Sequence, residues 1–526
     1  MPSLVALWTF ARSSVFAALL VVGALVLAGA ALVGTSMLSV GHLVGSGLAG
    51  VGLIGLASRQ RLDGITWRPS RAVFLALFCW VAAGYAVQVW AHYWAGAFSL
   101  WDVGIFADLL SSLALRDTYW SSPLGVHGFA DHFTPTLTLL TPLFNWTPSF
   151  MWLIGAKVVA MLVCAPLLHL IGREVLGKGS RWLWVMPCLW LVHTLCAFGV
   201  LFQFQPTHLA PPLALGAFLL ALRQRWVWLC VCLLLLAGLK EDMALVGMCV
   251  GMFLAVERRR PRIGAALIVA SIAIGLTIVL VVMPIFADGA PVLQHSRFNP
   301  LAFWPQKLFV VLVLLASVGL LPLFHPRSLW WILGAFSVHF VSGFEHMFGF
   351  RYHYHLVPLA LLFVASIYGI AAIQNGTGPL VRIGGRWRSL SIAAAVALVL
   401  SLNGMLPLFS ARLSWPTPTS RAIVSEVVAI ESQLPADYAV YATHELVPYL
   451  VPHARLRQFN GKPQRHSGSF FDTSEPHVVV LTTEPLALAL PDRPVLELMD
   501  EYAAKNGYRV EMPSPHLRLY WSTATP

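Results

Sequence analysis

Long apolar runs repeat along the first three quarters of this chain, and they restrict the fold more than any other feature of the sequence. A helix that crosses a bilayer needs roughly 20 such residues. A lipid-embedded backbone must satisfy its own hydrogen bonds, and these runs lack the alternating polarity of barrel strands. Only 11% of the residues are charged, against about 25% in soluble proteins. The sequence therefore predicts an all-α polytopic membrane bundle.

We expect about 13 spans, some of them shorter than a perpendicular helix requires. Short apolar segments between longer ones are typical of tilted, broken or re-entrant helices. The expected spans cover residues 14–36, 38–57, 72–93, 150–171, 182–202, 209–222, 226–239, 243–256, 263–286, 307–324, 329–344, 356–373 and 390–410.

Lys and Arg cluster in the loops on one side of this threading, which the positive-inside rule assigns to the cytoplasm. The net charge of +11 is scattered among these loops and does not form the basic domain of a nucleic-acid-binding protein. We therefore expect a multi-pass protein of a bacterial inner membrane, with a cytoplasmic N-terminus. The basic residues that carry this inference are Arg59, Arg61, Arg68, Arg71, Arg173, Lys178, Arg181, Arg223, Arg225, Arg258, Arg259, Arg260, Arg262, Arg327, Arg382, Arg386 and Arg388.

Composition changes near residue 411, where a Pro/Ser/Thr-rich linker begins. We predict a multi-span domain over 1–410, with an external loop at 94–149, and an external α/β domain over 411–526. In that domain the patterns predict helices at 420–434 and 494–506, strands at 439–443 and 477–483, and a terminal hairpin over 508–522. No phosphate-binding glycine motif accompanies these elements.

"WDVGIFADLL" places Asp102 and Asp108 beside hydrocarbon at the start of the first external loop. The neighbouring apolar residues predict a helix lying at the membrane surface. Asp102 is either its N-cap, a role that Asp favours, or a general base or metal-binding carboxylate at the membrane boundary.

Two further segments carry charge on the same predicted side. "GVHGFADHFTP" offers Asp131 and His132 as ligands for a divalent cation, or as a hydrogen-bonded pair in a solvated loop. "LKEDMAL" places Lys240, Glu241 and Asp242 between two apolar runs. Three charges there are costly in lipid, so the chain turns at this point or the charges face a polar cavity.

"FGFRYHYHLVP" alternates residue types, so an extended backbone would place Arg351, His353 and His355 on one face. Such a face suits a phosphate group, although an interfacial aromatic belt explains the intervening tyrosines. Gln205 and His208 in "FQFQPTHL" are weaker polar candidates after another span.

Taken in order, "WDVGIFADLLSSLALRDTYWSSPLGVHGFADHFTPTLTLLTPLF", "FQPTHLAPPLALGAFLL", "LLAGLKEDMAL" and "RYHYHLVPLALLF" resemble a prokaryotic membrane-protein family of unknown function. The resemblance spans about residues 95–375. That family in turn resembles the GT-C glycosyltransferases, multi-span enzymes that use polyprenyl-phosphate-linked sugars and carry an acidic catalytic residue in the first external loop. In this chain Ala107-Asp108 shifts the second acidic position by one, and Gln205 replaces a frequent His.

The resemblance implies a GT-C-like fold with Asp102 as the catalytic base. Asp131 and His132 match that family's Asp-His pair, and Lys240, Glu241 and Asp242 match its charged turn. From their residue types, Asp131, His132, Glu241 and Asp242 are acidic or metal-binding candidates for a divalent cation such as Mg²⁺ or Mn²⁺. The resemblance also implies that Lys240, Arg351, His353 and His355 bind the donor phosphate.

We therefore expect a glycosyltransferase that acts on the external face of the membrane. Its expected partners are a polyprenyl-phosphate-linked sugar donor, an unknown acceptor and membrane lipid, and we expect no nucleic-acid partner. Two alternatives remain open: a transporter or lipid-carrier translocator, whose polar residues should extend through both halves of the bundle, and a non-catalytic envelope assembly protein.

Overall fold

The structure, a computed structural model, describes residues 71–180, 182–287, 298–350, 352–377, 415–453, 455–459, 471, 475–483, 486 and 493–522. The expected spans at 14–36, 38–57 and 390–410 lie outside the described residues, as does Arg351.

Within the described part of the chain, 4 helical runs are long and apolar enough to cross a membrane. These are α3 (Arg71–Trp94), α7 (Met151–Leu176), the run Pro261–Phe286 and the run His353–Asn375. The third run joins α13 (Pro261–Thr277) through a π-helical turn to α14 (Met283–Phe286), and the fourth contains α17 (Leu356–Asn375). The helical membrane class is confirmed, whereas the expected number of spans is not.

Shorter helices fill the rest of the bundle: α8 (Val185–Val192), α9 (Thr194–Leu201), α10 (Ala210–Leu222), α11 (Trp226–Ala237), α12 (Leu245–Val256), α15 (Trp304–Ser317) and α16 (Arg327–Val341). Within the predicted span over 182–202 the chain breaks at His193 into α8 and α9. The His193 side chain accepts the Leu195 N–H at 3.1 Å and so begins the second helix.

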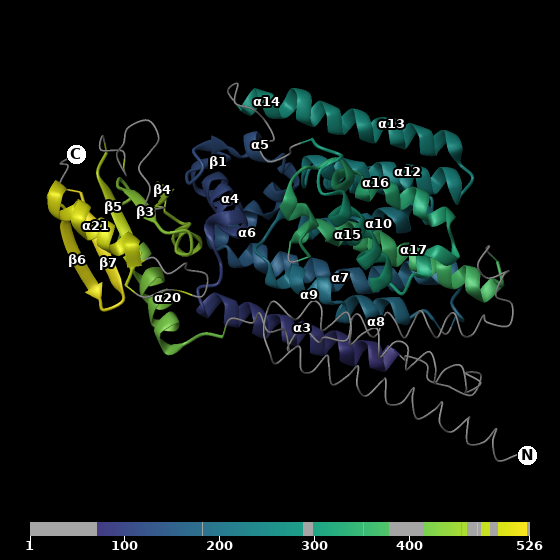
Figure 1. Cartoon of the computed structure of the whole chain (residues 1–526), viewed down its shortest axis with the longest axis horizontal. Coiled ribbons are helices and arrows are strands. Elements are labelled where there is room, and N and C mark those ends of the chain that lie inside the picture. The colour runs from purple at the N-terminus through teal and green to yellow at the C-terminus, as the bar shows by residue number, and fades with distance from the viewer. Residues whose placement is uncertain are drawn as a thin grey trace, which may run out of the picture.

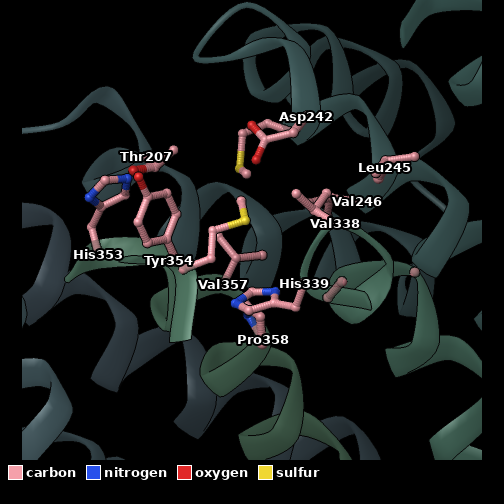
Figure 2. Close-up of a pocket in the computed structure, with 14 residues that line it drawn as sticks. Thr207, Asp242, Leu245, Val246, Val338, His339, His353, Tyr354, Val357 and Pro358 are labelled. Atoms are coloured by element: carbon pink, nitrogen blue, oxygen red, sulfur yellow. The ribbon is translucent and has the colours of Figure 1, made fainter. Parts of the chain in front are cut away.

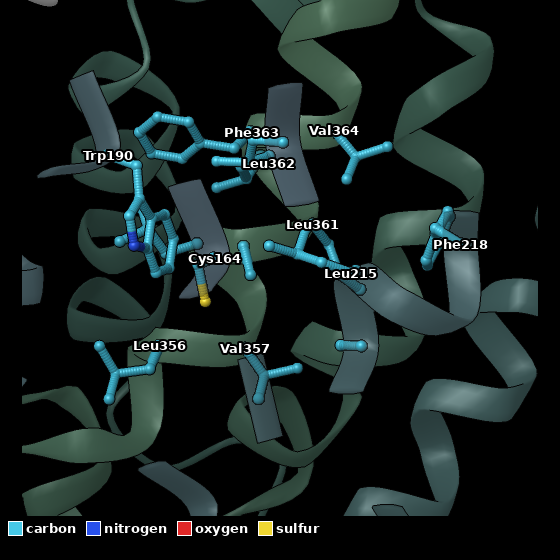
Figure 3. Close-up of a cluster of buried hydrophobic side chains, with 14 of the residues drawn as sticks. Cys164, Trp190, Leu215, Phe218, Leu356, Val357, Leu361, Leu362, Phe363 and Val364 are labelled. Carbon is cyan, nitrogen blue, oxygen red and sulfur yellow. The ribbon is translucent and has the colours of Figure 1, made fainter. Parts of the chain in front are cut away.

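Helix α17 forms the centre of the bundle core. Nearly all of its side chains are buried, and Leu356, Leu361 and Phe363 meet residues of α7, α8 and α10 (Figure 3). Beside α17, the indole N–H of Trp190 in α8 donates to the carbonyl of Met161 in α7 at 2.7 Å. The buried Trp thus satisfies its only polar group inside the apolar core.

The predicted loop at 94–149 is a compact layer at one end of the bundle (Figure 1). Its elements are η2 (Leu100–Gly104), α4 (Ile105–Arg116), β1 (Trp120–Ser121), β2 (Val126–His127), α5 (Gly128–Asp131), η3 (Pro135–Leu140) and α6 (Thr141–Trp146). The prediction that a helix in this segment lies at the membrane surface is wrong. Residues Ile105–Ser112 of α4 are buried between neighbouring elements and do not lie exposed at an interface.

A five-stranded sheet lies beyond this layer, with strand order β4-β3-β5-β7-β6. It consists of β3 (Ala439–Ala442), β4 (Leu456–Gln458), β5 (His477–Thr482), β6 (Arg509–Ser514) and β7 (Leu517–Trp521), accompanied by α20 (Pro418–Glu431), η12 (Val447–Leu450) and α21 (Arg493–Asn506). β3 pairs in parallel with both β4 and β5, whereas β7 pairs antiparallel with β5 and β6. The predicted helices and strands are present, and β4 adds a strand that no pattern indicated. The division of the chain at 410/411 stays a prediction.

Sheet and bundle are joined by a shared apolar core. Val447 and Leu450 of η12 pack in one cluster with Leu100 and Val103 of η2. The hydroxyl of Tyr449 donates to the carbonyl of Tyr93 at 2.7 Å. The C-terminal sheet therefore rests directly on the segment that contains Asp102.

A glycine in the core provides a test of this packing. A Cβ at Gly369 of α17 would lie 2.0 Å from the carbonyl oxygen of Leu321, whereas a Cβ at Gly155 of α7 would meet nothing within 4 Å. We expect Gly369→Ala to destabilise the protein by about 1–3 kcal/mol, because the backbone must shift. Gly155→Ala is the matched control and should be neutral or slightly stabilising. Thermal unfolding in detergent measures both, and equal melting temperatures would contradict this packing.

Candidate active site

Asp102 lies in a strained turn between Leu100 and Gly104. Its backbone has φ 74° and ψ −83°, a conformation that L-residues rarely adopt. The N-cap of α4 is Gly104, so the interpretation of Asp102 as an N-cap is wrong. Strained residues persist where the surroundings hold them and are frequent at functional sites. Asp102 is half-buried in this turn.

Two glutamines from the segment after α9 hold this turn. The Gln203 side chain accepts the Ser99 N–H at 3.1 Å and donates to the carbonyl of Ala97 at 2.9 Å. The amide of Gln205 donates directly to Oδ1 of Asp102. Gln205 departs from the pattern of the resembling family, yet it is the side chain that contacts Asp102. His208 Nδ1 in turn accepts the Gln205 backbone N–H at 2.9 Å.

The charged segment Lys240–Asp242 forms a turn between α11 and α12, as the sequence predicted. Lys240 and Glu241 are buried, with 8% of each exposed. Oε1 of Glu241 lies 3.1 Å from Nδ1 of His132, and its Oε2 accepts the Phe133 N–H at 3.3 Å. The loop at 94–149 and the turn after α11 are therefore joined by a buried carboxylate.

The charges of this cluster act on one another. Burial raises the pKa of Asp102 to about 6, although the Gln205 hydrogen bond and the positive charges of His132 and Lys240 oppose this effect. Burial disfavours the charged form of Lys240. The negative charges of Asp242 and Glu241 outweigh this effect and raise the pKa of Lys240 above its ordinary value. Lys240 is therefore a buried, permanent cation close to Asp102.

The two carboxylates beside Lys240, those of Glu241 and Asp242, have pKa values shifted in opposite directions. Burial alone would raise the pKa of Glu241, but His132 and Lys240 together lower it below its ordinary value. Burial raises the pKa of Asp242, where Lys240 opposes the effect and Glu241 adds to it. Glu241 is thus the carboxylate whose negative charge compensates the positive charges of Lys240 and His132.

The segment at 353–355 completes the cluster, but it is a 3₁₀ turn and not the extended strand that the alternation predicted. The ring of Tyr354 lies 5.7 Å from Nζ of Lys240. The ring of His353 lies 5.8 Å from that of His208. His355 points elsewhere and stacks on His339 with ring centroids 5.3 Å apart. His353 therefore joins the site, and His355 lies behind it.

A small, mostly apolar cavity with several polar groups in its wall extends the site into the bundle. Asp242, Thr207, His353, Tyr354 and His339 contribute to its walls (Figure 2). Its volume of about 30 Å³ is enough for roughly two water molecules. Asp242 Oδ1, Thr207 Oγ1 and both ring nitrogens of His339 and of His353 find no hydrogen-bond partner among the described residues. Water in this cavity would satisfy them.

Lys157 of α7 is a site residue that the sequence analysis missed. Its side chain is fully buried, its Nζ donates to the carbonyl of Phe202, and its charge acts on Asp102. A lone lysine in an apolar span was the available signal, because such residues are costly in a membrane and usually functional. Lys157 fixes the start of the segment that presents Gln205.

Asp108 and Asp131 have different positions. Asp108 is fully buried, accepts the Ser122 N–H at 2.8 Å and lies 3.9 Å from Arg116. Burial raises its pKa to about 7. Asp108 therefore stabilises the loop through Ser122 and Arg116. The charge of Asp131, in contrast, acts on both Asp102 and His132.

The metal-ligand expectation finds little geometric support. Among the described residues, no group of three or more His, Cys, Asp and Glu side chains could hold a metal ion. Glu241 is already engaged by His132 and Phe133, and a buried lysine lies beside the carboxylates. The expectation of a divalent cation stays a prediction, and we assign no step to one.

An open apolar groove of about 420 Å³ ends beside the charged turn. It contains Leu139 of η3, Leu234 of α11 and Ile278, and its inner wall includes Phe133 and Gly238. Phe133 binds Glu241 through its N–H, and Gly238 precedes Lys240 by two residues. The groove is thus lined by apolar helix surfaces and by Gly238, which leads into the charged turn, whereas Lys240 itself does not line it.

Comparison with known proteins supports the motif-based resemblance. A family model described as "Predicted membrane protein (DUF2079)" matches residues 97–512. No curated protein matches the chain.

Similar solved structures are the apo and undecaprenyl-phosphate-bound forms of ArnT from Cupriavidus metallidurans and the arabinosyltransferase EmbB from Mycobacterium smegmatis. Apo ArnT has 12% identity and a TM-score of 0.50, over 86% of this chain and 100% of ArnT. The bound form has 11% identity and a TM-score of 0.48, over 85% and 98%. EmbB has 16% identity and a TM-score of 0.36, over 80% and 45%.

These neighbours are GT-C glycosyltransferases, and the likeness to apo ArnT is one of fold. The match over most of the chain, together with the motifs that carry the same resemblance, shows that this protein belongs to the DUF2079 family of predicted membrane proteins.

Proposed function

We propose that this protein is an integral-membrane glycosyltransferase that takes a sugar from a polyprenyl phosphate on the external face of a bacterial inner membrane. The observation that carries the proposal is that Asp102 lies within electrostatic reach of the buried cation Lys240, which follows Gly238 of the apolar groove by two residues. A lipid-linked donor needs these three features together: a carboxylate for the acceptor, a cation for the phosphate, and an apolar channel for the chain.

In the proposed reaction the donor's isoprenoid chain lies in the groove and its phosphate lies at Lys240. Asp102 accepts the proton of an acceptor hydroxyl while that oxygen attacks the anomeric carbon of the sugar. The bond between this carbon and the phosphate oxygen breaks, and polyprenyl phosphate leaves with the bonding electrons. Lys240 stabilises the charge on the leaving phosphate, and His353 and Tyr354 supply further hydrogen-bond donors beside it.

The grouping of the candidates favours an enzyme over a translocator. Asp102, His132, Lys240, Glu241 and His353 meet at the end of the bundle nearest the sheet. A translocation pathway would need comparable groups along both halves of the bundle.

Replacement of the proposed base gives the first test. Asp102→Asn keeps the size and the contact with Gln205 but cannot accept the proton, so we expect sugar transfer to fall by roughly 10²–10⁴-fold. Transfer of radiolabelled sugar from lipid-linked donor in membrane vesicles measures it. Asp117→Asn is the matched control, since Asp117 is an exposed residue of the same loop. Normal turnover in Asp102→Asn would exclude Asp102 as the base.

The pH dependence gives a second test. Because the pKa of Asp102 is raised to about 6, the proton-accepting carboxylate dominates above that pH and is lost below it. We expect kcat/KM for transfer to be level above about pH 6.5 and to fall roughly tenfold per unit below about pH 5.5. Melting temperatures over the same range separate this effect from unfolding. A level profile down to pH 4.5 would argue against Asp102.

Donor binding tests the role of the cation separately from turnover. We expect Lys240→Met to weaken the binding of undecaprenyl phosphate by roughly tenfold or more, because the phosphate loses a charge-assisted hydrogen bond. Native mass spectrometry or titration in nanodiscs measures the affinity. Lys505→Met, at an exposed position in α21, serves as the control. Unchanged affinity in Lys240→Met would place the phosphate elsewhere.

A further inference from the structure

The parallel part of the C-terminal sheet contains a topological switch point. The chain passes from β3 to β4 on one side and then to β5 on the other side of β3. In open α/β sheets the connections leave in opposite directions at such a point, and ligands bind outside the carboxyl ends of the strands there. The segments that follow β3 and β5 are therefore the place in this sheet where a ligand is expected.

These segments lie against the Asp102 turn. The carbonyl of His444, directly after β3, accepts the Leu100 N–H at 2.5 Å. Leu486, which follows β5, packs so closely on Gly96 that a Cβ there would lie 2.7 Å away. The carboxyl edge of the sheet is thus in direct contact with the stretch of chain that leads into the Asp102 turn.

The carboxyl end of β3 presents a preorganised polar group. Oε1 of Glu445 accepts the Thr443 hydroxyl at 2.7 Å, and its Oε2 lies 3.1 Å from Nδ1 of His444. Only 3% of the Glu445 side chain is exposed, against 24% of the His444 side chain. The Glu445 carboxylate lies at ion-pair distance from Nδ1 without hydrogen-bond geometry, so it orients the ring by electrostatic attraction and leaves the other nitrogen, Nε2, for a ligand.

We propose that His444, oriented by Glu445, binds a hydroxyl group of a glycan acceptor on the sheet side of Asp102. This assignment rests on the proposed function, because Asp102 needs an acceptor hydroxyl within reach. In the proposed reaction Lys240 and the groove bind the donor on the bundle side of Asp102, so the acceptor approaches from the opposite side. Trp101, 54% exposed beside Asp102, adds an aromatic surface to this approach. Glu445 acts as a positioning residue.

Photo-crosslinking in cells tests the subsite without any assumption about turnover. The full-length protein carries p-benzoylphenylalanine in place of His444, and the control carries it in place of Arg509, an exposed residue of the far edge strand β6. After irradiation and purification, carbohydrate on the protein is detected by mass spectrometry. We expect a carbohydrate-containing adduct at the first position and none at the second. No such adduct at position 444, or equal adducts at both positions, would overturn the proposal.

Kinetics then distinguish this proposal from the proposed function. We expect His444→Ala to raise the half-saturating acceptor concentration at least roughly tenfold and to leave the undecaprenyl phosphate affinity unchanged. His444→Gln, which keeps an N–H near the position of Nε2, should restore part of the loss, and Glu445→Gln should give an intermediate effect. An unchanged acceptor dependence in His444→Ala would overturn the subsite. An adduct at position 444, together with a wild-type protein that binds no undecaprenyl phosphate, would instead refute the proposed donor.

Discussion

The burial of Lys240 is the constraint on which the site depends. A cation removed from water at the end of a membrane bundle needs carboxylates nearby, and Glu241 and Asp242 follow it directly in the chain. Glu241 is in turn held by His132 and by the Phe133 N–H, so charge compensation requires that two segments about 109 residues apart meet. The same contact brings the cation near Asp102, where a phosphate would also be attracted.

The strained turn at Asp102 shows how this position is maintained. A non-glycine residue at φ 74° is costly by roughly 1–3 kcal/mol, and it persists because neighbours from three directions fix it. Gln203 and Gln205 hold it from the segment after α9, Lys157 anchors that segment from α7, and the His444 carbonyl holds Leu100 from the sheet. Such a turn is preorganised, so little rearrangement is needed when a substrate arrives.

Much of this could be predicted from the sequence, and particular residues show why the rest could not. Charges placed between apolar runs identified Lys240, Glu241 and Asp102, because hydrocarbon makes every such charge costly. The pairing of His132 with Glu241 was not accessible, since a spacing of 109 residues carries no local pattern. The alternation around His353 predicted a strand, but tertiary packing forms a 3₁₀ turn there and separates His355 from His353. Gln205 was undervalued because a family pattern records typical residues and not contacts.

The sheet gives the site a second side that the bundle alone lacks. Leu486 packs so closely on Gly96 that a Cβ there would have no room, and Val447 packs on Gly104 at ordinary van der Waals distance. Rigid contact of this kind means that the carboxyl edge of β3 keeps a fixed position relative to Asp102. A membrane-embedded donor can reach Asp102 only from the bilayer, whereas a polar acceptor is excluded from the bilayer and must come through water. Under the proposed function, Asp102 therefore lies between the bundle, from which a lipid-linked donor would come, and the polar sheet edge, from which an acceptor would come.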